Sequence, residues 1–183
     1  MAEVLGFLNR SRHAPAAAAL YAAAVAAARD PAYYMVFGVP DTLDGRFDLL
    51  GLHAFLLIRR LQHAPPPGPA LAQGVFDAMF RDMDHTLREL GVGDLSVARR
   101  MKQMWEAFHG RAAAYEAALE DADGAALAVA LARNVWRNGP APHAAALAAA
   151  ARAHDAHLAA QPLAAFVSGT ATFLPGAASA GTP

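Results

Sequence analysis

The sequence predicts an all-α protein, built as a single-domain helical bundle of six or seven helices. Of its 183 residues, 49 are alanine, the residue with the highest helix propensity. Apolar side chains recur at intervals of three and four along several stretches, and no stretch shows the alternation typical of a β-strand. Short runs rich in Gly, Pro and Asp separate these stretches, and such short connections favour antiparallel neighbouring helices.

The bundle is expected to form around its most apolar segment, residues 43–63. Between Leu49 and Ile58 only His53 is polar, so a helix here is apolar on nearly every face and belongs at the centre of the bundle. The apolar run covers about ten residues, whereas a helix that spans a bilayer needs about 20. Arg59 and Arg60 follow the run, where positive charge suits the C-terminal end of a helix.

The start of this central helix carries a capping signal. Pro40 ends the preceding element, and either Asp41 or Thr42 is expected to cap the helix by accepting a hydrogen bond from a free backbone N–H group. Asp44 stands three residues after Asp41, as in a capping box, and its charge suits the positive helix end. We therefore expect Asp41 and Asp44 to act mainly on stability.

The other elements are predicted from periodicity and from the breaks that flank them. We expect a leader over residues 1–14, an all-helical domain over 15–167 and a flexible tail, poor in large apolar residues, over 168–183. The helix over 142–160 has few large apolar side chains and is expected at the edge of the domain. The predicted helices other than the central one cover residues 15–29, 70–90, 95–120, 125–138 and 142–160, with a short helical piece at 33–37 and one more turn at 163–167.

Glycine and aspartate residues mark the start of the longest predicted helix, 95–120, and a further glycine lies inside it. Gly91 is expected to end the preceding helix in a left-handed conformation, and Asp94 is expected to cap the long one. Gly110 lies in the middle of the helix, where it costs about 1 kcal/mol relative to alanine, and close approach of a neighbouring helix would explain it.

A stripe of large apolar residues follows the same helix. Its members are Met101, Met104, Trp105, Phe108 and Tyr115. At helical spacing a stripe of this kind is usually core, and we interpret it so. The alternative is an adaptable groove for an apolar partner, because methionine-rich surfaces adjust to what they bind.

The same helix also carries a group of basic residues. Arg99, Arg100 and Lys102 lie in its first two turns, where the helix dipole opposes positive charge, and Arg111 follows further along. A solvated face is the simplest interpretation. The alternative is a docking surface for an anion, which would be RNA phosphate, anionic lipid or an acidic protein.

Composition excludes several classes of function. The chain has 15 basic and 16 acidic residues, for a formal net charge of −1, which argues against a globally basic nucleic-acid binder. The absence of cysteine excludes disulfides, thiolate metal sites and cysteine nucleophiles.

No complete set of catalytic or metal-binding residues is recognisable, so we expect neither a metal nor an organic cofactor. Glu106 and His109 have the spacing of a di-metal helix motif, but the second copy that such a site requires is missing. His154 and Asp155 form an adjacent pair without the partner motifs of a metal hydrolase. We interpret His53 as a core histidine that is bonded to a carbonyl group.

Several short motifs, in order along the chain, resemble the ubiquinol–cytochrome c chaperone family. The resemblance covers residues 20–136 and includes His109, where the family pattern leads us to expect an aromatic residue. The motifs are Pro40-Asp41-Thr42-Leu43-Asp44-Gly45-Arg46-Phe47-Asp48, Leu52-His53-Ala54-Phe55-Leu56, Arg59-Arg60-Leu61, Phe76, Met83-Asp84, Leu87-Arg88-Glu89, Gly91-Val92-Gly93-Asp94, Arg100-Met101-Lys102, Phe108, Gly110-Arg111 and Tyr115.

The resemblance implies an all-helical assembly factor rather than an enzyme. Its client would be newly made cytochrome b, or a similar membrane protein, during assembly of the ubiquinol–cytochrome c reductase. An alphaproteobacterial member would be cytoplasmic and peripheral to the inner membrane, with the ribosome, an anionic membrane surface and a small partner protein as further candidate partners. The candidate partner-binding residues are Arg46, Arg99, Arg100, Lys102, Arg111 and Tyr115.

Two other interpretations remain open from the sequence. One is a helical small-molecule-binding or metal-dependent enzyme, which would need polar groups that converge on a cavity of the bundle. The other is a structural subunit of a larger complex.

Overall fold

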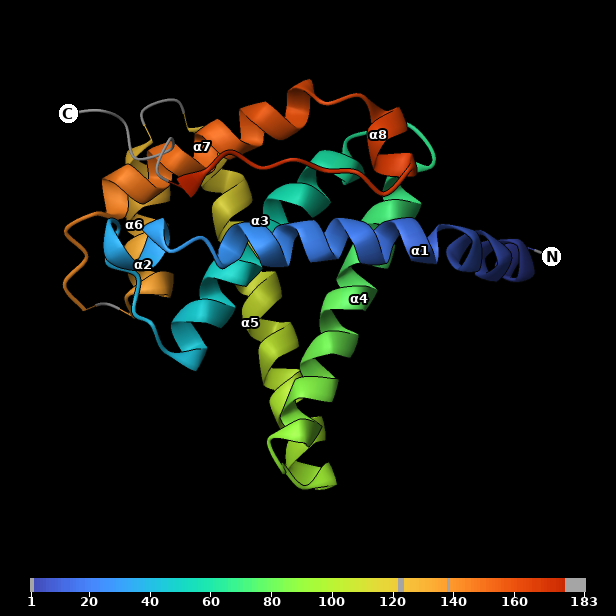
Figure 1. Ribbon diagram of the computed structural model, residues 1–183, viewed down its shortest axis with the longest axis horizontal. Helices are drawn as coiled ribbons and strands as arrows, with labels where there is room; N and C mark the ends of the chain where they lie inside the picture. Colours follow the sequence, from blue (N-terminus) through green and yellow to red (C-terminus); the bar gives the residue numbers. More distant parts are fainter. Residues whose placement is uncertain (1, 122–123, 138, 177–183) are drawn as a thin grey trace.

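The computed structural model describes the backbone of residues 2–121, 124–137 and 139–176, with side chains from residue 12 onward. Within these ranges all regular structure is α-helical, which confirms the predicted fold class (Figure 1). Two of the helices, α2 and α8, are single turns. The helices are α1 (Ala2–Ala28), α2 (Ala32–Met35), α3 (Leu43–Gln62), α4 (Gly68–Glu89), α5 (Asp94–Glu120), α6 (Ala125–Val135), α7 (Ala144–Ala160) and α8 (Leu163–Val167).

Helix α3 lies at the centre of the bundle, as its uniform hydrophobicity predicts. Every residue from Gly51 to Ile58 is buried, and α3 contacts α1, α4, α5, α6 and α7. No helix in the described part of the chain combines the length and the hydropathy needed to cross a membrane.

The entry to α3 confirms one of the two expected capping residues. Thr42 is the N-cap, and its Oγ1 accepts a hydrogen bond of 3.1 Å from the backbone N–H of Gly45. Asp41 instead forms an exposed ion pair with Arg46, with 2.6 Å between its Oδ1 and the arginine Nε. A Cβ atom on Gly45 would overlap the carbonyl oxygen of Pro40, so this tight turn requires glycine.

Both ends of the chain differ from the sequence-based expectation. Helix α1 begins at Ala2 and continues through Pro15, so the expected leader forms the first half of this helix. Of the expected tail, residues 170–176 pack back over α7. The backbone N–H and C=O of Thr172 pair with the side-chain amide of Gln161 at 2.9 and 2.8 Å, and the N–H of Gly176 donates to Asp30 at 2.8 Å. The remainder, 177–183, lies outside the described residues.

Small residues decide how closely α1 approaches α4. A Cβ atom on Gly74 of α4 would lie 2.6 Å from the Cβ of Ala17, so glycine is needed at this crossing. The close approach expected at Gly110 is wrong, because that residue is exposed and no neighbouring atom would lie within 4 Å of an added Cβ.

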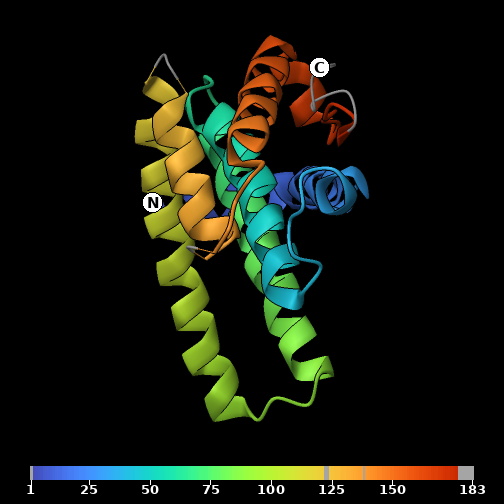
Figure 2. The same cartoon turned by 90° about the vertical axis from the view of Figure 1, so that its left-hand side faces the viewer.

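Helices α4 and α5 form a hairpin that projects beyond the rest of the bundle (Figures 1 and 2). Gly91 has a φ of +74° in the connection, as predicted for the residue that ends α4. Asp94 is not the cap of α5: Gly93 occupies that position, and Asp94 pairs with Arg88 across the turn at 2.6 Å.

A buried chain of hydrogen bonds joins three helices and the C-terminal segment. His53 of α3 bonds the carbonyl of Leu49 through Nδ1 at 2.9 Å, as expected of a core histidine. Its Nε2 lies 3.1 Å from the hydroxyl of Tyr33 on α2, which lies 2.7 Å from Nε2 of His154 on α7. The backbone N–H of Leu174 donates to Nδ1 of His154 at 3.3 Å.

The partners at the two ends fix the direction of every bond in this chain. The carbonyl of Leu49 can only accept, so His53 donates from Nδ1 and accepts at Nε2 from the Tyr33 hydroxyl. The N–H of Leu174 can only donate, so His154 accepts at Nδ1 and donates from Nε2 to the Tyr33 oxygen. Both histidines are therefore neutral, and all three side chains are 1% exposed.

Removal of the central hydroxyl group should destabilise the protein. Tyr33→Phe leaves the Nε2 atoms of His53 and His154 buried without a partner, at an expected cost of about 1–3 kcal/mol in the free energy of unfolding. The measurement is urea denaturation followed by circular dichroism. Tyr34→Phe is the matched control, because its hydroxyl makes one half-buried bond to Ala28 and its loss should cost about 1 kcal/mol. Equal losses in the two variants would contradict a special role for the chain.

Stability should also depend on pH through the two histidines. Burial lowers the pKa of His53 to about 4 and that of His154 to about 3, from an ordinary value of 6.5. Between about pH 6.5 and pH 4 the unfolded chain binds protons at these histidines that the folded protein does not bind. The free energy of unfolding therefore falls as the pH decreases through this range. Urea denaturation across this range should give a shallower decline for His154→Gln than for the wild type, whereas parallel curves would refute the assignment.

Candidate functional site

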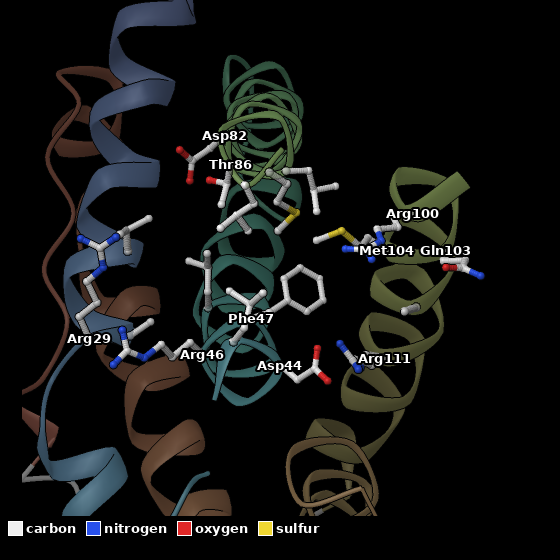
Figure 3. Close-up of a pocket in the computed structure, with 18 of the residues that line it drawn as sticks. Arg29, Asp44, Arg46, Phe47, Asp82, Thr86, Arg100, Gln103, Met104 and Arg111 are labelled. Carbon is white, nitrogen blue, oxygen red and sulfur yellow. The ribbon is translucent and has the colours of Figure 1, made fainter. Parts of the chain in front are cut away.

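A groove opens on the side of the bundle where the projecting hairpin leaves the body. It lies between the C-terminal end of α1, the start of α3, the second half of α4 and the middle of α5, and encloses about 740 Å³ (Figure 3). Its apolar lining comes from α1, α3, α4, the α4–α5 connection and α5, and consists of Val25, Ala28, Leu43, Phe47, Leu50, Met83, Leu87, Leu90, Met104 and Ala107.

Five arginines surround this lining, and we call the site the arginine groove. They come from the residue after α1, from α3 and α5, and from the segment after α6, and are Arg29, Arg46, Arg100, Arg111 and Arg137. Asp44 and Asp82 are the acidic residues that line it in the described part of the chain. Both are engaged, since Asp44 lies 3.3 Å from Arg137 and Asp82 accepts a 2.7 Å hydrogen bond from the Tyr21 hydroxyl.

The arginines differ in how they are held. Arg46 pairs with Asp41, and Arg111 and Arg137 both reach Asp48. Arg29 and Arg100 form no ion pair with any described residue. The positive charge of these two side chains is therefore available to a ligand.

Asp48 does not line the groove, but it holds two of the groove arginines. Its side chain is fully buried, with Oδ1 at 2.6 Å from Nη1 of Arg111 and Oδ2 at 3.4 Å from Nη2 of Arg137. Burial raises the pKa of this carboxyl group, and the two guanidinium groups oppose that shift. Arg111 thus joins α5 to α3 and stacks over the ring of Phe47, with 5.7 Å from its guanidinium carbon to the ring centre.

The structure brings together half of the predicted partner-binding residues. Arg46, Arg100 and Arg111 all line the groove. Arg99 and Lys102 are exposed on α5 but do not line it.

Tyr115 is not available to a partner. It is 1% exposed, and its ring packs against Phe55 with 5.7 Å between ring centres. Burial raises its pKa to about 12. The prediction that Tyr115 binds a partner is therefore wrong, and Tyr115 is a core residue.

The apolar stripe of α5 divides between the two roles considered for it. Phe108 and Tyr115 are buried core residues, Met104 lines the groove, and Trp105 is 47% exposed. Residues spaced three and four apart do not return to the same angle around an α-helix. Along the stripe the side chains therefore point in gradually different directions, some toward the core and some toward the groove.

Sequence reasoning missed Arg29, Arg137 and the role of Asp48. Arg29 and Arg137 come from distant parts of the chain, and no local pattern marks them. Asp48 did carry a sequence signal, because it is an acidic residue directly before the apolar run of α3. In the folded protein its side chain is fully buried.

Other basic motif residues are structural. Arg59 of α3 pairs with Glu116 of α5 at 3.0 Å and with Asp155 of α7 at 2.9 Å. Arg60 donates to the carbonyl groups of Leu158 and Gln161 at the end of α7. Across the described residues, no three His, Asp or Glu side chains are placed to hold a metal ion together.

Comparison with known proteins identifies the family. The sequence model of the family described as "Ubiquinol-cytochrome C chaperone" matches residues 35–173. The chain belongs to the ubiquinol–cytochrome c chaperone family. The match spans α3 to α8 and includes Asp44, Arg100 and Arg111 of the groove, and the family is one of chaperones for assembly of the ubiquinol–cytochrome c reductase.

A solved structure supports this family assignment over nearly the whole chain. The chain is similar to the protein described as "Crystal structure of the Cbp3 homolog from Brucella abortus", with 38% sequence identity and a TM-score of 0.82. The likeness covers 97% of this chain and 98% of that one. The comparison with curated protein sequences found no match.

The buried ion pair of the groove gives a stability prediction for this family member. Arg111→Ala should lower the free energy of unfolding by about 3–5 kcal/mol, because it leaves the Asp48 carboxylate buried without its nearest cation. The double variant Asp48→Asn with Arg111→Ala should lose less than the sum of the two single variants.

Urea denaturation of the three variants and the wild type completes the cycle. Arg137→Ala serves as a control, because this arginine is 54% exposed and lies farther from Asp48. If the losses in the free energy of unfolding for the two single variants add up to the loss for the double variant, Asp48 and Arg111 do not interact energetically.

Proposed function

We propose that this chain is a non-enzymatic chaperone that holds newly made cytochrome b, or a similar membrane-protein client, during assembly of the ubiquinol–cytochrome c reductase. We further propose that the client binds in the arginine groove. One observation carries the second proposal: motifs that are far apart in the sequence and carry the family resemblance meet at this groove. Asp44, Phe47, Met83, Leu87 and Arg100 all belong to them.

The chemistry of the groove suits a segment of a membrane protein that has not yet been inserted. Such a segment exposes apolar side chains that would aggregate in water, and the groove offers it apolar side chains from four helices. Helix-in-groove recognition works in this way, with anchors on one face of the bound helix. Met83 and Met104 add adaptability, since methionine fills irregular spaces.

The arginines add orientation to this apolar contact. Guanidinium groups bind carboxylates and free carbonyl groups in defined geometry, and the stems of arginine side chains cover apolar surface. Arg29 and Arg100 lie without an ion pair among the described residues and can take up an acidic residue or the C-terminal carbonyl groups of a client helix. A client segment of this kind leaves its ribosome at the cytoplasmic side of the inner membrane, which is where this proposal places the chaperone.

Charge reversal within the groove should weaken client binding without unfolding the protein. Arg100 is exposed and makes no ion pair with a described residue, so Arg100→Glu should change stability by less than about 0.5 kcal/mol. The same change puts an acidic group where the client is expected to present one. We expect the amount of cytochrome b that co-purifies with the chaperone to fall at least tenfold. The measurement is quantitative mass spectrometry on membranes from cells that are actively producing cytochrome b.

Arg133→Glu is the matched control, because Arg133 is an exposed arginine on α6 that does not line the groove. A photo-crosslinking amino acid at Gln103, which faces the groove, should label the client directly, whereas the same group at Val129 should not. If both arginine variants retain cytochrome b equally, or if the two crosslinkers label it equally, the groove is not the client site.

A further inference from the structure

The tip of the α4–α5 hairpin exposes two leucines to solvent. Leu90 at the end of α4 is 60% exposed, and Leu95 in the first turn of α5 is 92% exposed. The hairpin extends away from the body, so both residues lie at its outermost end (Figures 1 and 2). Neither leucine packs in the core of the bundle.

Cations follow Leu95 along one side of α5. Arg99 and Lys102 come four and seven residues later, so all three lie on one face of the helix. Trp105, three residues beyond Lys102 and 47% exposed, borders this face. We call Leu95, Arg99, Lys102 and Trp105 the outer face of α5.

The outer face is separate from the arginine groove. On α5 the groove is lined by Arg100, Gln103, Met104, Ala107 and Arg111, which lie about 80° or more around the helix from Leu95 and Lys102 at 100° per residue. One ligand can therefore contact the outer face while another occupies the groove.

Around the tip, four acidic side chains face four Lys and Arg side chains, but the pairing is uneven because Arg88 pairs with two of the acids. Each acidic side chain here has a basic partner within 4 Å, and the pairs are Asp84–Arg88, Asp94–Arg88, Glu89–His85 and Glu106–Lys102. Arg99 and Arg100 have no acidic partner among the described residues. Their charge is placed in the first two turns of α5, where the helix dipole opposes it.

We propose that the hairpin tip and the outer face of α5 bind an anionic phospholipid membrane. The leucines enter the boundary between headgroups and acyl chains, Trp105 lies at the headgroup level, and Arg99 and Lys102 contact lipid phosphates. Apolar side chains that penetrate the interface and cations that add electrostatic attraction are the two contributions by which proteins bind anionic membrane surfaces.

The shape and the chemistry of the tip favour lipid over RNA or protein. RNA phosphate would use the cations, but it offers nothing apolar to Leu90 and Leu95. A folded protein would need a concave surface to accept the protruding leucines, whereas a bilayer yields to them. The proposal does not rest on the client function of the groove, since Leu95, Arg99, Lys102 and Trp105 do not line the groove and Leu90 is the one residue that both surfaces use.

The test is flotation of the full-length protein with vesicles of phosphatidylcholine, either alone or mixed with phosphatidylglycerol. We expect binding only to the anionic vesicles, and we expect that binding to weaken as salt is added. Leu95→Ser should weaken it about tenfold or more, from the lost transfer of a leucine side chain. Arg99→Gln should weaken it about fivefold, since each surface cation contributes about a fivefold factor.

Matched controls are available on α6, away from the hairpin. Val129 is 70% exposed and Arg133 is exposed, so Val129→Ser and Arg133→Gln remove the same kinds of group from another surface and should bind like the wild type. Equal binding by Leu95→Ser and the wild type would overturn the proposal. So would a wild-type protein that ignores anionic vesicles but sediments with ribosomes through Arg99, because that result assigns the surface to RNA.

Tryptophan fluorescence gives a second measurement that does not depend on affinity. Trp105 is half-exposed, whereas Trp136 is 8% exposed and donates its Nε1–H to the carbonyl of Gly38. Anionic vesicles should shift the emission to shorter wavelengths, and the shift should vanish in Trp105→Phe. An unchanged spectrum at saturating vesicle concentration would contradict contact of the outer face with lipid. Photo-crosslinking of the client at Gln103 should be unaffected by Leu95→Ser, so either proposal can fail without the other.

Discussion

The hydroxyl group of Tyr33 is the point at which the upper part of the bundle is held together. It donates to His53 of α3 and accepts from His154 of α7, and His154 in turn receives the backbone N–H of Leu174. These groups are buried, so an unmade bond at any point would leave a polar atom without water. The position of α2 is thereby fixed, and with it the turn that leads into Thr42 and the start of α3, which forms one wall of the groove.

Local sequence signals were sufficient for most of the fold. The apolar run of α3, the glycine that ends α4 and the breaks between helices act over a few residues, so they can be recognised without knowledge of the tertiary structure. The errors lie where distant contacts decide the outcome. Residues 170–176 have the composition of a flexible tail, but Thr172 pairs with Gln161 and Phe173 packs against His53 and His154. Composition carries no information about such partners.

The candidate site was predictable only in part, for the same reason. Arg46, Arg100 and Arg111 were expected at a partner surface from the family resemblance and from the unfavourable position of Arg100 in its helix. Arg29 and Arg137 are contributed by segments more than 100 residues apart, and only the folded chain brings them together. Tyr115 shows the opposite error: it was predicted to bind a partner because it matches the family pattern, but it is a core residue. A residue can match a family pattern because it supports the fold beneath a site.

The projecting hairpin has a mechanical consequence for the groove. From Asp94 to Ala107 the one buried residue of α5 is Val97, whereas beyond Phe108 the helix is anchored in the body by Tyr115 and Ala118. Segments with few buried contacts open locally at a lower free energy than the whole domain unfolds. The two sides of the groove therefore differ in stiffness: α3 continues from the groove into the buried stretch that begins at Asp48, and the α5 side can yield. A cleft of this construction can widen for a bulky segment and close on a slender one while the core remains packed.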